Sequence, residues 1–551
     1  MDLFPEKAQF LSGEEVILRL ETGGNVPCTA QVTVSRLDQK ILQKTVQVMK
    51  ENGSISLGRF DAGFFGYGVD AVVSTNTGTA VLRTAFDVTD NPRRSLRYGF
   101  LCDFTEQDAE NGAIDWLCKC HINMVQYYDW SFRHDQLVAA QNHYQDMMGK
   151  TICRQTVKDK ICQGHQRGML AIAYGAVYAA SRAFFDCHRD WAFFNSNQEP
   201  FVFIDVFYLM NLQSGSPWRR HLIGQYRAAM EEMGFDGIHM DTYGFPKTAY
   251  SHLREPPELV RLDEELPSLI RQTRQSLTAA GKTPYLVFNN VGNWPVYSTA
   301  DAPQDAVYIE VWSPYERYFQ IAQLIQEAKM LAGREKTIIL AAYLKPFREE
   351  NREAAMAAAQ ILTAAIVSNG AYHLLLGENK AVLTQGYYSD YTLLTDEDAN
   401  VLRRYYDFLI RYLNLFYDPE LRNVSMTHMG WDNYEYQCLS HPVSVYGEAG
   451  KIWAILREKP GRKCLFSVNL RGCGDDFWNR GKQAPELQHN VRWRVQVDRP
   501  VRKICMASPE APEARELPYQ YTDNEKGRFA EFTIPTIGVW NAVWMDFQEE
   551  R

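Results

Sequence analysis

The sequence lacks the motifs that mark several common kinds of enzyme site. Its 11 cysteines include no CxxC pair, and the two closest, Cys118 and Cys120, form only a CxC. That spacing predicts neither a zinc site nor a disulfide framework. The chain also contains no HExxH and no GxSxG, so zinc-peptidase and serine-hydrolase chemistry are not indicated. We therefore expect no metal and no cofactor.

Long apolar runs and basic blocks are missing as well. No stretch approaches 18 uninterrupted apolar residues, so we expect no membrane span. The net charge is −9 without any Lys/Arg-rich segment, which argues against a nucleic-acid partner. The first residues have neither a basic start nor an apolar core, so they do not resemble a signal peptide. We expect a cytoplasmic protein, or a secreted one whose leader was removed. The sequence gives no indication of oligomeric state.

The patterning that is present divides the chain into three parts. Residues 1–92 and 421–551 show short alternating strands separated by turn residues, whereas residues 93–420 alternate short apolar runs with helix-length amphipathic segments. The predicted fold class is multidomain α/β. A central (β/α)8 TIM barrel is flanked by an N-terminal immunoglobulin-like β-sandwich and a C-terminal antiparallel Greek-key β-sandwich.

Eight candidate strands support the barrel. They cover residues 98–104, 122–127, 169–174, 237–241, 285–290, 307–311, 338–342 and 371–375. Four of the intervening helices are predicted at 218–233, 258–279, 319–331 and 352–367. A doubly wound open sheet is the main rival, but its first strand should lead into a Gly-rich phosphate loop, and none follows the first strand here.

Acidic, amide and aromatic residues gather where these strands end. Asp241 ends the fourth strand and Glu310 lies near the end of the sixth. Barrel enzymes place their reacting groups at this edge. Two carboxyls among aromatic side chains are the equipment of glycoside hydrolysis, which needs a nucleophile near the sugar C1 and a protonated acid beside the leaving oxygen. The shorter Asp241 suits the nucleophile. Glu310, next to Trp312 and apolar neighbours, suits the acid, because desolvation raises a carboxyl pKa.

Ordinary structural roles remain open for each of these residues. Asp241 could cap a helix or fold a loop, and Glu310 could pair with an arginine in the core. His239 is more simply read as a packed or hydrogen-bonded histidine than as a ligand.

At family level, the barrel segments resemble glycoside hydrolase family 66, the family of endo-dextranases and cycloisomaltooligosaccharide glucanotransferases. The most specific block is Tyr127-Tyr128-Asp129-Trp130 followed by Arg133-His134-Asp135. Further matching segments cover residues 97–101, 121–126, 173–175, 178–180, 234–237, 241–242, 288–291, 310–312, 341–343 and 373–378.

The resemblance implies a retaining enzyme that acts on α-1,6-linked glucan such as dextran or isomaltooligosaccharides. It places the nucleophile on Asp241 and the acid/base on Glu310. By their positions at strand ends, six further residues are expected to contact the sugar: Tyr128, Asp129, Tyr174, Asn290, Trp312 and His373.

Two alternatives accompany this expectation. A transglycosylase would form cyclic or elongated isomaltooligosaccharides, but the loops around the last two strands look too short for the carbohydrate-binding insertion of cyclising members. A non-catalytic carbohydrate-binding protein is disfavoured because both carboxyls are present.

Overall fold

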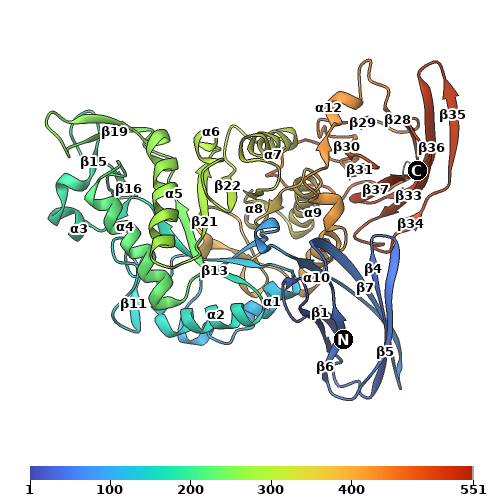
Figure 1. The fold of residues 1–551 in the computed structure, drawn as a ribbon, viewed down its shortest axis with the longest axis horizontal. Coiled ribbons are helices and arrows are strands. Elements are labelled where there is room, and N and C mark those ends of the chain that lie inside the picture. The colour runs from blue at the N-terminus through green and yellow to red at the C-terminus, as the bar shows by residue number, and fades with distance from the viewer. Residues whose placement is uncertain (549–551) are drawn as a thin grey trace.

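The computed structural model describes residues 1–548 and has a multidomain α/β architecture with an eight-stranded parallel barrel at its centre (Figure 1). Each of the eight predicted barrel strands is present in this sheet. In chain order they are β9 (Tyr98–Leu101), β10 (Met124–Tyr127), β13 (Leu170–Ala176), β18 (Gly237–Asp241), β21 (Tyr285–Val291), β22 (Ala306–Glu310), β23 (Thr337–Ala341) and β24 (Tyr372–His373).

The strands pair with their neighbours in chain order, which is the arrangement of a barrel rather than of a doubly wound sheet. Nearly all of their residues are buried, as expected for strands covered on both faces. The first strand meets the segment just after the last one through a parallel bridge, Phe100 to Gly377, so the barrel is almost closed.

Helices cover the outside of the barrel between the strands (Figure 1). The main ones are α1 (Ala113–Lys119), α2 (Arg154–Gln166), α4 (Pro217–Ala228), α5 (Leu262–Ala279), α7 (Tyr318–Ala332), α9 (Arg352–Ser368) and α10 (Asp396–Arg411). Side-chain caps fix two starts: Asn351 accepts from Ala354 N at α9, and Thr395 accepts from Asp398 N at α10.

One helix begins later than predicted. The sequence placed its start at residue 258, but Glu258–Arg261 forms a strand, β20, which pairs with β19 (Thr248–Ser251). Tertiary pairing overrides the local helical pattern here, so α5 begins at Leu262.

The N-terminal region contains two sheets that share one apolar core. Its longer strands are β3 (Glu15–Glu21), β4 (Cys28–Arg36), β5 (Gln39–Val48), β6 (Asn52–Arg59), β7 (Phe64–Thr75) and β8 (Gly78–Thr89). Strand β7 lies against α10, where a Cβ on Gly66 would stand 1.9 Å from the Ile410 carbonyl oxygen. Nearby, Arg411 forms an ion pair with Asp70 at 2.7 Å. The barrel and this region are therefore firmly joined.

The C-terminal region also consists of two mainly antiparallel sheets around an apolar core (Figure 1, orange to red). Its longer strands are β30 (Ile452–Lys459), β31 (Arg462–Asn469), β32 (Gln488–Gln496), β33 (Val501–Ala507), β35 (Tyr519–Asn524), β36 (Gly527–Ile537) and β37 (Trp540–Phe547). The immunoglobulin-like and Greek-key assignments and the exact domain boundaries stay predictions. Among residues 1–548, no helix has the length and apolar character needed to span a bilayer.

Two insertions rise from the barrel beside the strand ends. After β10 comes the hairpin of β11 (His143–Gln145) and β12 (Thr151–Cys153). After β13 comes a longer segment with α3 (Arg182–Cys187) and the short strands β14 (Ala179–Ala180), β16 (Val202–Phe203) and β17 (Phe207–Leu209). Both insertions contribute residues to the cavity described next.

Candidate active site

A cavity of about 460 Å³ opens at the carboxyl ends of the barrel strands. Side chains from strands two to six, from the segments that follow the strands and from the loop after β24 line it, with aromatic rings predominating. The lining includes Tyr128, Asp129, Met148, Tyr174, Phe203, Ile204, His239, Asp241, Tyr243, Asn289, Tyr308, Glu310, Trp312, Tyr343, Gly386, Tyr387 and Tyr388.

Three adjacent strands bring the two predicted carboxyls together. Asp241 is the last residue of β18 and Glu310 the last of β22, while Asn289 lies on β21 between them. Glu310 pairs with Val291, two residues beyond Asn289 on β21. Asp241 follows Met240, which pairs with Phe288, and is therefore level with Asn289. All three side chains emerge at the carboxyl end of the barrel, within two residues of one level. They enter the cavity because alternate residues of a strand face the same side.

Asn289 joins the two carboxyls through one nitrogen atom. Its Nδ2 donates to Asp241 Oδ1 at 2.7 Å and to Glu310 Oε2 at 3.1 Å. The two carboxylate oxygens are therefore at most about 5.8 Å apart, below the roughly 6.5–9.5 Å that inverting glycosidases use. These contacts differ from the structural roles considered for the two carboxyls. The partner of both is the Asn289 amide, not an arginine.

Tyrosine side chains also link the two carboxyls, along the part of the cavity lining that does not include Asn289. Tyr174 donates its hydroxyl to Asp241 Oδ2 at 2.7 Å, and Tyr343 donates to Glu310 Oε1 at 2.8 Å. Between them the ring of Tyr128 lies 4.8 Å from Tyr174 and 4.5 Å from Tyr388, which in turn lies 6.1 Å from Tyr343. We call these four residues, Tyr174, Tyr128, Tyr388 and Tyr343, the tyrosine arc.

Burial controls the charge of the pair. It raises the pKa of Asp241 to about 7, and the neighbouring Glu310 carboxylate adds to the shift. Burial also raises the pKa of Glu310, while the hydrogen bonds from Asn289 and Tyr343 oppose the rise. Two carboxyls this close titrate as a unit and hold one proton between them over a broad pH range. One ionised and one protonated carboxyl is the state that double displacement requires.

Two further titratable groups in the cavity, His239 and Asp129, have pKa values that favour the neutral form at pH 7. Burial lowers the pKa of His239 to about 3, and its Nδ1 lies 3.0 Å from the Tyr98 hydroxyl. This agrees with the interpretation of His239 as a hydrogen-bonded histidine. Burial and the nearby Asp146 raise the pKa of Asp129 to about 8, so this carboxyl carries a proton that it can donate.

The structure brings four of the six predicted sugar contacts to the cavity: Tyr128, Asp129, Tyr174 and Trp312. Asn290 and His373 do not line it. Asn290 donates to the Tyr308 carbonyl and accepts from Thr299, while His373 lies against Thr363 and the Ala342 carbonyl. Both face outward because their neighbours in the chain, Asn289 and Leu374, take the inward positions. We retain neither as a sugar contact.

Other lining residues were not among the predicted contacts. Tyr343 directly follows one predicted strand and Asn289 is the penultimate residue of another, and the alternation of facing along a strand could have favoured Asn289. Phe203 lies on the short strand β16, and Tyr243 and Tyr388 follow the barrel strands β18 and β24. The sequence offers no periodic signal for any of these short segments. Phe203 and Tyr243 stack with ring centroids 4.2 Å apart and form one side of the cavity.

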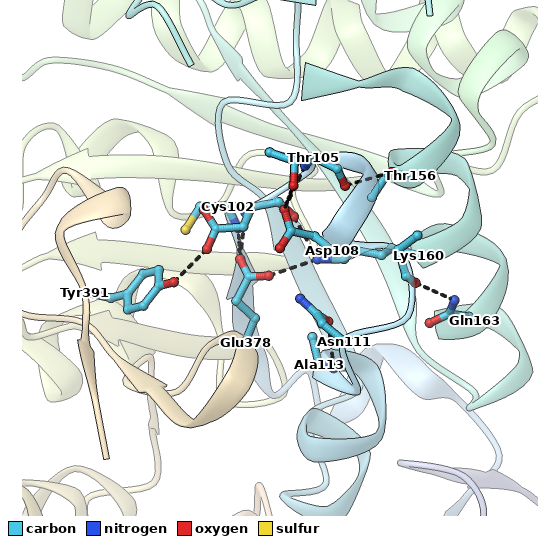
Figure 2. Close-up of polar contacts among 12 residues, drawn as sticks. Cys102, Thr105, Asp108, Asn111, Ala113, Thr156, Lys160, Gln163, Glu378 and Tyr391 are labelled. Carbon is cyan, nitrogen blue, oxygen red and sulfur yellow. Dashed lines mark hydrogen bonds and ion pairs between the residues drawn. The ribbon is translucent and has the colours of Figure 1, made fainter. Parts of the chain in front are cut away.

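Within residues 1–548, two groups of side chains have the spacing to hold a metal ion, Glu106–His143–Cys153 and Cys102–Asp103–Glu378. Neither group lines the cavity. In the second, Glu378 already forms a buried ion pair with Lys160 at 2.9 Å (Figure 2).

Comparison with known proteins identifies the family. The model of glycosyl hydrolase family 66 matches residues 5–544, almost the whole chain. The chain belongs to this family. Among curated family 66 relatives, a cycloisomaltooligosaccharide glucanotransferase of Niallia circulans is 20% identical over 98% of this chain and 71% of its own length. A dextranase of Streptococcus salivarius is 22% identical over 71% of this chain and 54% of its own.

Solved structures agree on the fold of this family 66 member. A Paenibacillus sp. cycloisomaltooligosaccharide glucanotransferase complexed with cycloisomaltoheptaose superposes with a TM-score of 0.89, at 19% identity over 99% of both chains. A maltogenic α-amylase of Thermotoga neapolitana reaches a TM-score of 0.52, at 11% identity over 83% of this chain and 100% of its own.

Proposed function

We propose that this protein is a retaining glycoside hydrolase that cleaves α-1,6-glucosidic linkages in isomaltooligosaccharides or dextran. The observation that carries the proposal is the Asp241–Asn289–Glu310 bridge, which holds two carboxyls close enough for double displacement. The relatives named dextranase and cycloisomaltooligosaccharide glucanotransferase supply the linkage.

The chemistry proceeds in two displacements. Asp241 attacks C1 of the sugar while the bond from C1 to the leaving oxygen breaks, and that oxygen takes the proton of Glu310. A glucosyl ester on Asp241 results. Glu310, now ionised, removes a proton from water as the water oxygen bonds to C1, and Asp241 leaves as a carboxylate. The aromatic walls and the neutral Asp129 are suited to hold the sugar through ring contacts and hydroxyl hydrogen bonds.

Loss of either carboxyl tests the roles. Asp241→Ala and Glu310→Gln should each lower the release of reducing ends from isomaltotriose and dextran, the second by about 10²–10⁴-fold. The first product detected by NMR should be the α-anomer. Near-full activity in either variant, or a β-anomer formed first, would contradict the assignment.

Transglycosylation is the second candidate, because the superposed Paenibacillus protein is a glucanotransferase. The alignment with the Niallia relative, however, runs over 705 positions, more than the 551 residues here, so that relative carries stretches without a counterpart in this chain. Mass spectrometry of products separates the candidates: linear short sugars indicate hydrolysis, and rings or elongated chains indicate transfer.

A further inference from the structure

Three side chains outside the cavity have a combination of ligand atoms that suits a zinc ion. They are Glu106, His143 and Cys153, and one oxygen, one nitrogen and one sulfur atom of this group all lie within 4.8 Å of one another. Glu106 begins the short helix η2 (Glu106–Asp108) after β9, whereas His143 and Cys153 lie on β11 and β12. The expectation of no metal rested on spacing motifs, and this group has none because the fold brings it together from three segments.

The hairpin of β11 and β12 fixes the position of His143 relative to Cys153. The two residues are direct partners across this antiparallel pair, so their side chains leave the same face. The Cβ atoms of such partners are about 4.5–5.5 Å apart. His143 and Cys153 can therefore reach one ion without moving the backbone.

Backbone contacts hold Glu106 against this pair. Thr156 of α2 donates its hydroxyl to the Thr105 carbonyl at 3.0 Å, which fixes the segment after β9 on the first turn of α2 (Figure 2). Glu106 follows directly, and its Oε1 lies 2.8 Å from His143 Nε2. Because Cys153 is the residue directly before α2, the same docking keeps Glu106 beside the sulfur.

An ion pair between Glu106 and His143 would by itself explain their short distance, but it does not account for Cys153. Their side chains are 70% and 55% exposed, and exposed pairs of this kind contribute little to stability. The Cys153 sulfur lies close to the same atoms although a thiol adds nothing to an ion pair. Asn142 Nδ2 donates to this sulfur at 3.5 Å, as outer residues do when they orient a metal ligand. Cys153 is also the N-cap of α2, where the helix dipole favours negative charge.

The distances are close to those of tetrahedral zinc. Zinc bonds of about 2.3 Å to sulfur and about 2.0–2.2 Å to nitrogen or oxygen place neighbouring ligand atoms about 3.3–3.6 Å apart. The spacings in this group, from 2.8 Å to at most 4.8 Å, reach those values when side-chain atoms move by about 1 Å. Glu106 and His143 are exposed and free to make that adjustment. Calcium and magnesium fit less well, because both prefer oxygen ligands.

We propose that Glu106, His143 and Cys153 bind one zinc ion, with water as the fourth ligand. The ion joins the segment after β9 to the hairpin of β11 and β12, and the turn of this hairpin carries Met148 into the cavity lining. It therefore holds one lining segment in place from outside the cavity. None of the three ligands lines the cavity, so the ion takes no part in the proposed bond cleavage, and the inference does not depend on it.

Cobalt(II) is the probe, because it replaces zinc in tetrahedral sites and its thiolate complexes absorb strongly in the near ultraviolet. The full-length protein, reduced and treated with a chelator, should take up one equivalent of Co²⁺ with this absorption. One equivalent of Zn²⁺ should abolish the absorption and raise Tm, since the ion binds only the folded arrangement. Absence of the absorption, or no saturation at one equivalent, would overturn the proposal.

Variants show whether the ion binds at this group. Loss of an outer contact already lowers metal affinity by about 10–100-fold, so Cys153→Ser should lower zinc affinity at least that much and abolish the cobalt absorption. Cys162→Ser is the matched control, because Cys162 is an exposed thiol on α2 that does not belong to the group. His143→Ala, at an exposed position, should also weaken binding while leaving the metal-free Tm unchanged, which guards against a folding defect in Cys153→Ser. If Cys153→Ser keeps the absorption, or Cys162→Ser loses it, the ion binds adventitiously at another thiol and the proposal fails.

Discussion

Replacing Tyr174 by phenylalanine removes a single oxygen atom from the candidate site. The Tyr174 hydroxyl donates to Asp241 Oδ2 at 2.7 Å in a buried environment. A hydrogen bond to a charged group contributes about 1.5–3 kcal/mol, and one pKa unit corresponds to about 1.4 kcal/mol. Because the bond stabilises the ionised form, its loss should raise the pKa of Asp241 by about 1–2 units.

The direction of the change in activity follows from the nucleophile role that we propose for Asp241. The nucleophile must be ionised, so the acid limb of kcat/KM against pH should move upward by about 1–2 pH units in Tyr174→Phe. Below that limb the variant should be about 10–100-fold slower, and above it the activity should approach that of the wild type. The assay is glucose release from isomaltotriose across the pH range.

Tyr343→Phe is the matched control, because Tyr343 donates to Glu310 in the same way. Its loss should raise the pKa of Glu310. Since Glu310 must be protonated, the alkaline limb should then move upward while the acid limb stays in place. If Tyr174→Phe moves the alkaline limb and Tyr343→Phe the acid limb, the two roles are exchanged. If neither limb moves, these hydrogen bonds do not control the pair.

Three further variants probe stability. The pKa of Asp129 is raised to about 8 in the folded protein. Between pH 4 and pH 8 this carboxyl is therefore ionised in the unfolded chain but protonated in the folded one, so the free energy of unfolding falls as pH rises. Asp129→Asn should raise Tm more at pH 8 than at pH 4. Lys160→Met leaves Glu378 buried without its cation and should lower the free energy of unfolding by about 3–5 kcal/mol in urea. Gly66→Ala forces α10 away from β7 and should cost about 1–3 kcal/mol.

For each of these three stability predictions there is an outcome that would contradict it. An equal Tm gain at both pH values would show that Asp129 is ionised in the folded protein. Arg182→Met, which breaks an exposed pair with Asp186, should leave stability unchanged, and a loss matching that of Lys160→Met would refute the role of burial. Gly63→Ala, whose Cβ would stand 3.5 Å from Asp90 Oδ2, should be tolerated where Gly66→Ala is not.

The barrel strands were predictable because their signal is local. Apolar runs such as those of β18 and β22 end at a carboxylate, and the pattern survives in the structure to within a few residues. The helix predicted from residue 258 shows the limit: its first turn is a strand only because β19 pairs with it, and that contact has no counterpart in the local pattern.

The sequence indicated the two carboxyls of the candidate site but not the side chains that contact them or line the cavity beside them. The choice of Asn290 over Asn289 does not match the lining of the cavity. Both amides stand in Phe288-Asn289-Asn290-Val291, and alternation along the strand says that they face opposite sides, but the register of β21 against its neighbours determines which side is the inside. Likewise, nothing local indicates that Tyr388, beyond the last strand, stacks on Tyr128.

The Asn289 amide, which contacts both carboxyls, also affects how the negative charge is stabilised as it moves from one carboxyl to the other. In the first displacement of the proposed mechanism, negative charge would leave Asp241, which becomes an ester, and arrive on Glu310, which loses its proton. The Asn289 nitrogen already faces both oxygens, so one fixed donor serves the charge before and after the transfer. In the resting state the negative charge would lie on Asp241, and in the covalent intermediate on Glu310. Because Asn289 already contacts both oxygens, neither half-reaction would require β21 to rearrange.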